Sequence, residues 1–456
     1  MLMGGFMLAK FFLGLIFSQS VQASNNFIYE ESIRKNCRRE VIEKSFLNSD
    51  KSIILQNDRA QNLVEDKEKM IFSLADMESL KLLKKEVSSI PWSDTYWPLY
   101  EGGLGHRYND PQMHFGNWKD SHNYVMKETA SKLIKKKKFD FLSPSEKYDY
   151  LLDLKDVNLT NISWADGEAY FIEYGKVETW MGLCHGWAAA SMMMTNPEKR
   201  VEINKDGNKM TFYPSDIKGL GTMLWANGQF ETRFIGGRCN SKNPSIDEMG
   251  RSVEADCLDN NPGTWHLAIV NQIGIFDRSF VMDASSDYQV WNQPVYGYEY
   301  VYFNPKTNIE SQNLSEAIVK INDWDTDVKK AVRAPQTKSI VGIKMRVTYI
   351  SENSPTLAEF QEVNFVKTEY IYDLELDEKN NIIGGEWSSD NHPDFLWVAK
   401  KDAFPSTIGD NLGLEIDLNN ISSDVKKAAA ANLKYKLPFG SFVRELFKGS
   451  SFQNNR

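Results

Sequence analysis

The stretch "ETWMGLCHGWAAASMMM", residues 178 to 194, is the feature that most limits how this chain can fold. If it is helical, Cys184, Trp187, Ala188 and Ser191 share one face, at three- and four-residue spacing. The alanines and methionines are then apolar enough to be buried. We therefore expect a core helix that begins at the cysteine.

A cysteine in the first turn of a helix is a candidate nucleophile. The unpaired N–H groups and the positive end of the helix dipole there lower the pKa of a thiol and stabilise an oxyanion. His185 is a poor base for Cys184, because adjacent helical residues point in different directions. A metal site is also weak, since no second Cys or His lies nearby at ligand spacing. A nucleophile and a plain core helix are the alternatives that remain.

A partner for the cysteine lies in "TWHLAIVNQIGIFDRSFVMDA", residues 264 to 284. The pattern predicts a strand, a turn at "FDRS" and a second strand. His266 and Gln272 then share one face, and Asp283 lies opposite Gln272 on that same face. A regular ladder would leave His266 and Asp283 about 20 Å apart, so a bulge or strong strand curvature is required.

Cys184, His266 and Asp283 occur in the order that thiol acyl transfer uses. The imidazole accepts the thiol proton, and the carboxylate fixes its tautomer. Taken singly, His266 could be a hydrogen-bonded core histidine and Asp283 a turn former at a strand end. The combination favours a catalytic site.

Six blocks of sequence are informative together. They are, in order, "WPLYEGGLGHRYND" (97–110), "LSPSEKYDYLL" (142–152), "TWMGLCHGWAAAS" (179–191), "RCN" with "CLDNNPGTWHLAIVNQIG" (238–274), "FVMDASSDYQVWNQPVYGY" (280–298) and "GGEWSSDNHPDFLW" (384–397). With these blocks the chain resembles the transglutaminase elicitor family of plant-pathogenic oomycetes and bacteria, whose members share a papain- and transglutaminase-like cysteine site. The resemblance covers roughly residues 92 to 400.

The resemblance implies an α+β fold of papain and transglutaminase type, in which a cysteine-bearing helix packs on an antiparallel sheet that carries the histidine and the aspartate. It implies Cys184 as nucleophile, His266 as general base and then acid, and Asp283 as orienting carboxylate. The backbone N–H of Cys184 is the expected oxyanion donor, and Trp180 is a weak second candidate whose competing role is core packing.

The implied reaction is a protein-glutamine gamma-glutamyl transfer. The thiolate attacks a glutamine carboxamide, ammonia leaves, and the thioester passes its acyl group to a primary amine. The expected partners are therefore a glutamine-containing protein or peptide and an amine. No cofactor is required for this chemistry. Animal enzymes of this kind use calcium, but the sequence has no EF-hand spacing, so the need for calcium is left open.

Two alternatives use the same sequence features. With water as acceptor, the same triad gives a cysteine peptidase, deamidase or amidase. The other alternative is a secreted binding module whose site is inactive. The presence of all three residues argues against the second alternative.

The first residues are typical of an export signal. Lys10 precedes the apolar segment "FFLGLIF", and "VQA" ends at Ala23 before the expected cleavage. An uncleaved anchor competes with this interpretation, although a membrane span needs roughly 20 apolar residues and Lys10 interrupts this one. We expect a secreted or periplasmic protein without stable membrane insertion after signal cleavage.

Export places the four cysteines in an oxidising compartment. Cys239 and Cys257 lie in polar, turn-rich contexts at the ends of one loop, and we expect a disulfide between them. Two free thiols are the alternative. Cys184 would then have only Cys37 as a partner.

The pattern of composition predicts five segments: a signal peptide (1–23), a helical N-terminal region (24–90), the catalytic core (91–300), a β-rich part (301–405) and a polar tail (406–456). Within the β-rich part, "SIVGIKMRVTYISE" and "KTEYIYDLELDEKNNIIGGEW" alternate apolar and polar residues as antiparallel strands do. The net charge of −9 argues against a nucleic-acid surface. The basic run from Lys135 to Lys138 is interpreted as a solvated helix face.

Overall fold

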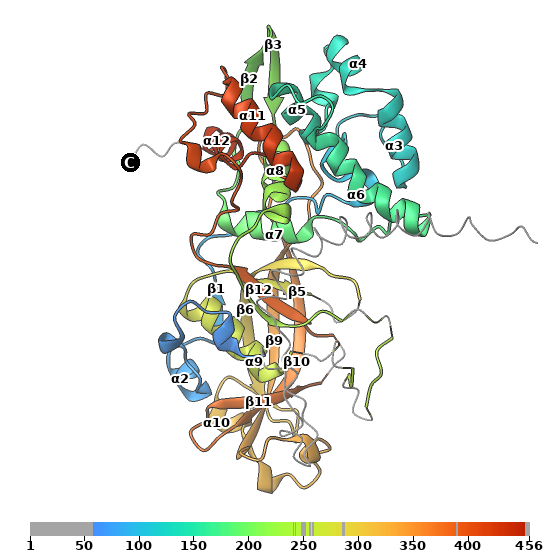
Figure 1. The fold of residues 1–456 in the computed structure, drawn as a ribbon. Helices are drawn as coiled ribbons and strands as arrows, with labels where there is room; N and C mark the ends of the chain where they lie inside the picture. The colour runs from blue at the N-terminus through green and yellow to red at the C-terminus, as the bar shows by residue number, and fades with distance from the viewer. Residues whose placement is uncertain are drawn as a thin grey trace, which may run out of the picture.

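The computed structural model describes residues 58–451, except 240, 242, 248–251, 255–256, 258–259, 285–287 and 389–390. The predicted signal peptide and Cys37 therefore lie outside the described residues. Most helices gather in one half of the molecule, and the main antiparallel sheet lies in the other half together with α2, α9 and α10 (Figure 1).

The main sheet is antiparallel, with the strand order β11-β10-β9-β6-β5-β12-β4. Short strands β1 and β7 pair with β6, and β8 pairs with β9. A separate hairpin is formed by β2 and β3. The strands are β1 (Lys84–Glu86), β2 (Val201–Lys205), β3 (Asn208–Phe212), β4 (Thr232–Gly236), β5 (Val281–Asp283), β6 (Asn292–Phe303), β7 (Glu310–Ser311), β8 (Val319–Lys320), β9 (Ser339–Ser351), β10 (Asn364–Leu376), β11 (Ile382–Trp387) and β12 (Phe395–Ala399).

The two predicted strand segments of the β-rich part are confirmed as β9 and the β10–β11 hairpin. Met345 pairs with Tyr370, and Ile343 pairs with Tyr372. Those four side chains are buried, as the alternation of apolar residues predicts for one face of a sheet.

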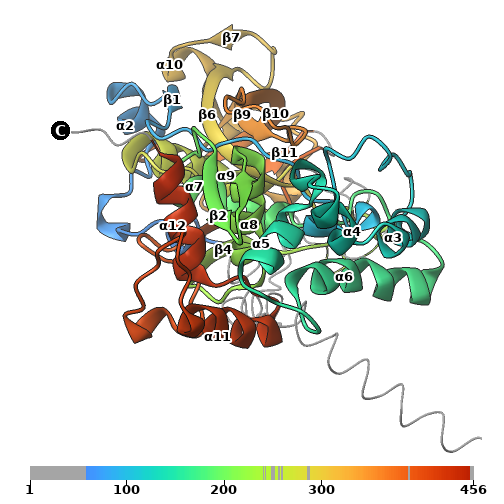
Figure 2. The same cartoon turned by 90° about the horizontal axis from the view of Figure 1, so that it is seen from above.

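The α-helices of the described part are α2 (Leu74–Ser79), α3 (Trp118–Lys127), α4 (Ala130–Lys135), α5 (Pro144–Leu151), α6 (Leu159–Tyr174), α7 (Cys184–Met193), α8 (Pro214–Asn227), α9 (Pro262–Ile269), α10 (Leu314–Ala317), α11 (Ser423–Asn432) and α12 (Gly440–Ser450). In this part of the chain, no helix combines the length and the apolar character that a bilayer crossing needs. Seen from above in Figure 2, α11 and α12 lie on one side and α3, α4 and α6 on the other.

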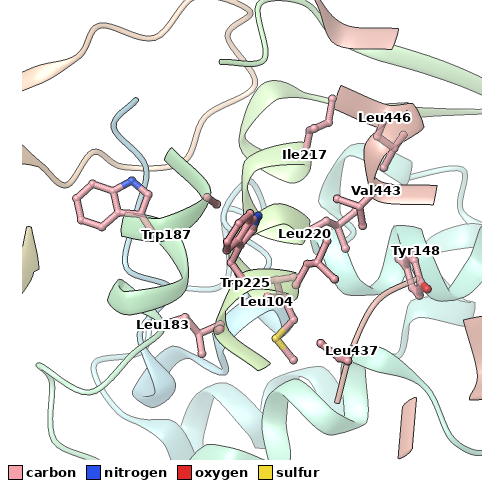
Figure 3. Packing of buried hydrophobic residues seen from close by; sticks show 14 of the residues in the cluster. Leu104, Tyr148, Leu183, Trp187, Ile217, Leu220, Trp225, Leu437, Val443 and Leu446 are labelled. Atoms are coloured by element: carbon pink, nitrogen blue, oxygen red, sulfur yellow. The ribbon is translucent and has the colours of Figure 1, made fainter. Parts of the chain in front are cut away.

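The expected core helix is confirmed as α7, which begins at Cys184 and packs closely on α8. Gly186 allows this approach, because a Cβ there would lie 2.3 Å from the Thr222 carbonyl oxygen of α8. Figure 3 shows Trp187 of α7 beside Trp225 of α8 in the same core.

The segment after residue 406 contributes to this core as well. Val443 and Leu446 of α12 are fully buried against α8, as Figure 3 shows. The segment was expected to be a polar tail. It also contains α11, whose Ala429 is fully buried.

One predicted boundary falls within a strand, and one region that was predicted to be helical contributes to the main sheet. Strand β6 runs through residue 300, where the catalytic core was expected to end. Strand β1, within the expected helical N-terminal region, pairs with β6 of the main sheet. The described part of residues 24–90 thus includes a strand of the sheet as well as the helix α2.

The part of the sheet formed by β4, β12 and β5 has two buried faces. Successive residues along each strand belong alternately to the core around α7 and to the core around α9. We call the two sides the α7 face (Phe234, Val281 and Trp397) and the α9 face (Ile235, Met282 and Val398). Helices α7 and α9 therefore pack on opposite sides of one sheet.

The strand predicted at 264–275 is wrong. Residues Pro262–Ile269 form α9, which continues as a π-helix over Val270–Ile275. Its sequence resembles a strand because nearly every side is buried and apolar, which hides the helical period. Asn261 marks the start, since its side chain accepts a hydrogen bond from the Gly263 N–H at 2.8 Å. Pro262 then occupies the first helical position.

Candidate functional site

Cys184 lies at the N-terminus of α7, on the α7 face, and is only 5% exposed. The preceding Leu183 anchors the turn by donating its backbone N–H to the Tyr96 carbonyl oxygen at 2.6 Å. Gly182 permits this approach, because a Cβ there would lie 2.5 Å from the same oxygen. The position of the thiol is therefore fixed by backbone contacts on its N-terminal side.

The sulfur of Cys184 has two polar neighbours from the chain that enters β6. The Nδ2 group of Asn292 donates to the sulfur at 3.4 Å, and the thiol donates to the Val290 carbonyl oxygen at 3.8 Å. The Oδ1 atom of Asn292 accepts a hydrogen bond from Trp397 Nε1 at 2.8 Å. The amide is thus held between a tryptophan of β12 and the cysteine.

Asp283 ends β5, and its Cα lies opposite that of Asn292 in the ladder of β5 and β6. It shares the α7 face with Val281, two residues earlier in the strand. Its Oδ1 atom accepts the Trp291 N–H at 2.9 Å. The structure therefore brings Asp283 to the same face of the sheet as Cys184.

The pKa of the Cys184 thiol is raised, chiefly by burial. The hydrogen bonds from Asn292 lower this pKa, whereas the negative charges of Glu352 and Asp283 raise it. The position at a helix N-terminus was expected to lower the pKa of this thiol, whereas burial raises it.

Glu352 is a site residue that the sequence analysis missed. It follows the last residue of β9, and its Oε1 atom accepts a hydrogen bond from Gln293 Nε2 at 2.9 Å. Burial raises the pKa of its carboxyl group. Nothing in the local sequence distinguishes it from other strand-end glutamates, because β9 must first pair with β6 to bring it near the thiol.

His266 lies in α9, fully buried on the α9 face. Its Nδ1 atom is 2.9 Å from the Tyr372 hydroxyl, and its ring is 4.8 Å from that of Tyr300 in an edge-to-face contact. Burial lowers the pKa of the imidazole to about 3. The side chain is therefore neutral at pH 7 and surrounded by tyrosines.

The structure does not bring His266 to Cys184. Cys184 contacts Asn292 at the start of β6, whereas His266 contacts Tyr300, eight residues further along that strand, or roughly 26 Å. The expected common face of His266 and Asp283 is wrong, because α9 replaces the strand on which that geometry depended. The proposed role of His266 as base is not supported by this arrangement.

Partly buried aromatic residues lie around the segment that precedes Cys184. Trp180 and Tyr288 are in edge-to-face contact at 5.8 Å, and so are Tyr96 and Trp291. Glu178 joins the first pair, since Trp180 Nε1 and the Tyr288 hydroxyl both donate to its Oε2 atom at 3.0 Å. The indole N–H of Trp180, the weak second candidate for an oxyanion donor, is therefore engaged by Glu178.

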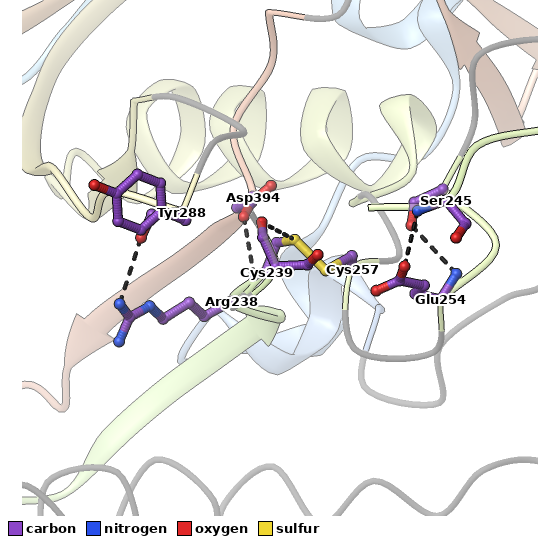
Figure 4. Close-up of a disulfide and its surroundings, with 9 residues drawn as sticks. Arg238, Cys239, Ser245, Glu254, Cys257, Tyr288 and Asp394 are labelled. Carbon is purple, nitrogen blue, oxygen red and sulfur yellow. Dashed lines mark hydrogen bonds between the residues drawn. A yellow bond between two sulfur atoms is a disulfide. The ribbon is translucent and has the colours of Figure 1, made fainter. Parts of the chain in front are cut away.

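The predicted disulfide between Cys239 and Cys257 is confirmed (Figure 4). The N–H of Cys239 donates to Asp394 Oδ2 at 3.2 Å, which ties this loop to the residue preceding β12. Arg238 donates to the Tyr288 carbonyl oxygen at 3.4 Å. Among the described cysteines, Cys184 is the free one.

Within the described ranges, no three His, Cys, Asp or Glu side chains form a cluster that could hold a metal ion.

The family model for the transglutaminase elicitor matches residues 67–430, which is most of the chain. The protein belongs to the transglutaminase elicitor family. A solved structure, the GP42 transglutaminase from Phytophthora sojae, matches with a TM-score of 0.53 and 21% sequence identity. The match covers 84% of this chain and 94% of that one, and it indicates a shared fold. No curated protein matches the sequence.

Proposed function

We propose that this protein is an exported, transglutaminase-like acyltransferase in which Cys184 forms a thioester with a glutamine side chain. The observation that carries the proposal is the position of the thiol. It is the free cysteine of the described part, it begins a helix, and it is hydrogen-bonded to an amide from the strand beside Asp283. Membership of the family supports this assignment.

In the proposed reaction, the Cys184 sulfur attacks the carboxamide carbon of glutamine, and the S–H bond breaks as the S–C bond forms. The thiol proton passes to Asp283, which shares this face of the sheet, and then to the nitrogen that leaves as ammonia. The first-turn N–H groups of α7 have no acceptor within the helix and would donate to the oxyanion. A neutral amine then attacks the thioester carbon. Its N–C bond forms as the S–C bond breaks, and the proton that its nitrogen loses passes through Asp283 to the sulfur, which restores the Cys184 thiol.

The carboxylates near the thiol support an amine as the acceptor. Asp283 and Glu352 both act electrostatically on Cys184, and their negative charge would attract a primary ammonium group. The aromatic residues Tyr96 and Trp291 could contact the methylene chain that carries such a group. We therefore propose transfer to an amine over hydrolysis.

The test is amine incorporation by the purified mature protein. A glutamine-rich protein and a labelled primary amine are supplied with and without calcium, and Cys184→Ser serves as the isosteric control. We expect labelling that is absent from the variant. Release of ammonia without labelling would indicate a deamidase or amidase, and release of peptides would indicate a peptidase. The absence of every reaction would leave a binding module and overturn the proposal.

A further inference from the structure

We propose that Asn292 is a catalytic residue whose amide, oriented by Trp397, donates a hydrogen bond to the Cys184 thiolate. The proposal assigns a second group that touches the reacting sulfur. Its role in acyl transfer rests on the proposed function, but its effect on the thiol can be measured without any substrate.

The orientation of the Asn292 amide follows from the chemistry of its two neighbours. The indole Nε1 of Trp397 can only donate, so it must meet the acceptor end of the amide, Oδ1. The donor end, Nδ2, then faces the sulfur of Cys184. Trp397 therefore determines that a donor, and not an acceptor, is presented to the thiol.

A donor at this position favours the thiolate over the thiol. Burial of Cys184 opposes ionisation, and the nearby carboxylates Glu352 and Asp283 oppose it further. The hydrogen bonds of Asn292 act in the opposite direction. When the proton leaves, the sulfur gains charge and the bond from Nδ2 becomes charge-assisted and stronger.

The amide is also well placed to stay fixed during the reaction. Asn292 is 4% exposed and lies at the first position of β6, directly opposite Asp283 in the adjacent strand. Trp397 is fully enclosed in the core around α7. A buried, doubly anchored donor loses little further freedom when the thiolate forms.

Asparagine suits this site because its side chain is neutral as well as because of its shape. An aspartate would fit the same space and still accept from Trp397. It would, however, place a third carboxylate beside a thiol that already experiences the charges of Glu352 and Asp283. Asn292→Asp thus keeps the shape of the residue while it reverses the electrostatic effect.

The experiment measures the rate of Cys184 alkylation by iodoacetamide against pH in the full chain, with the modified peptide quantified by mass spectrometry. For Asn292→Asp we expect the pH midpoint to move upward and the rate at pH 7 to fall roughly tenfold or more. For Trp397→Phe we expect roughly a threefold fall, because the amide loses the bond that orients it.

Trp387→Phe is the matched control. Its Nε1 atom donates to the Asn260 carbonyl oxygen at 2.7 Å, so this variant also loses one indole hydrogen bond, but away from the thiol. We expect its alkylation profile to match that of the unmodified protein. Thermal melting of each variant shows whether it is folded.

An alkylation profile that is unchanged in folded Asn292→Asp would overturn the proposal and leave the amide a packing role. If that variant does not fold, Trp397→Phe decides, since a profile equal to that of Trp387→Phe also overturns the inference. These failures differ from failure of the proposed function. In that case the unmodified protein incorporates no amine, although its thiol still responds to Asn292.

Discussion

One sheet buries a titratable group on each of its two faces, and the surroundings of the two groups differ in chemical character. On the α7 face, the Cys184 thiol has an amide donor and the charges of two carboxylates as neighbours. On the α9 face, the His266 imidazole is enclosed by tyrosines, and burial lowers its pKa to about 3. Burial among neutral tyrosines thus keeps the imidazole uncharged, whereas the buried thiol has an amide donor whose hydrogen bond favours its charged form.

The largest expected effect is the loss of activity when the thiol on the α7 face is replaced. Cys184→Ser should lower amine incorporation by about a thousandfold or more, because a serine hydroxyl is a far weaker nucleophile without a matched base. Its melting temperature should change little, since the substitution is nearly isosteric. Amine incorporation and thermal melting of the same preparation check this expectation, which retained labelling would contradict.

The next largest effect concerns stability on the α9 face. His266→Ala removes a fully buried ring between Tyr300 and Tyr372, and it should lower the free energy of unfolding by about 3 kcal/mol. Urea denaturation measures this loss.

The same variant tests whether His266 takes part in the reaction. Amine incorporation per folded molecule should stay within about threefold of the unmodified protein. A loss of roughly a hundredfold or more is what removal of a general base produces. That result would return His266 to the triad and show that the enzyme rearranges before it acts.

A smaller effect tests the close packing of α7 on α8. Gly186→Ala places a Cβ 2.3 Å from the Thr222 carbonyl oxygen, so α7 and α8 must move apart, at a cost of about 2 kcal/mol. Gly116→Ala is the control, because its Cβ would meet nothing within 4 Å. Denaturation curves compare the two, and equal stability would show that the helices adjust without strain.

The smallest expected effect, roughly 1 kcal/mol for each pH unit, is a dependence of stability on pH. The folded-state pKa of His266, about 3, lies below the ordinary value of 6.5 for a histidine. The unfolded chain therefore binds the extra proton, and stability is lost as the pH falls below about 6.5. The variant His266→Phe has no imidazole to protonate, so its free energy of unfolding does not fall in this way. The difference in free energy of unfolding between the unmodified protein and this variant should therefore shrink by roughly 1 kcal/mol per pH unit between pH 6 and 4. Urea denaturation at several pH values tests it, and a constant deficit would contradict it.

Much of the fold was predictable where local patterns decide structure. The helix that begins at Cys184, the strands β9, β10 and β11 and the bridge between Cys239 and Cys257 all follow from periodicity or local composition. The structure of the segment around His266 was not predictable, because a helix buried on nearly all sides shows no amphipathic period. The capping sequence Asn261–Pro262 was the available signal.

The sequence by itself determined the chemical inventory: a cysteine at a helix start, a disulfide elsewhere, and the family to which the chain belongs. Only the tertiary structure decided the partners of that cysteine. Asn292, Trp397 and Glu352 come from three strands or strand ends that pairing brings together, and no local pattern encodes their meeting. The same pairing separates His266 from Cys184, because consecutive residues of a strand face opposite sides and each helix packs on one side alone.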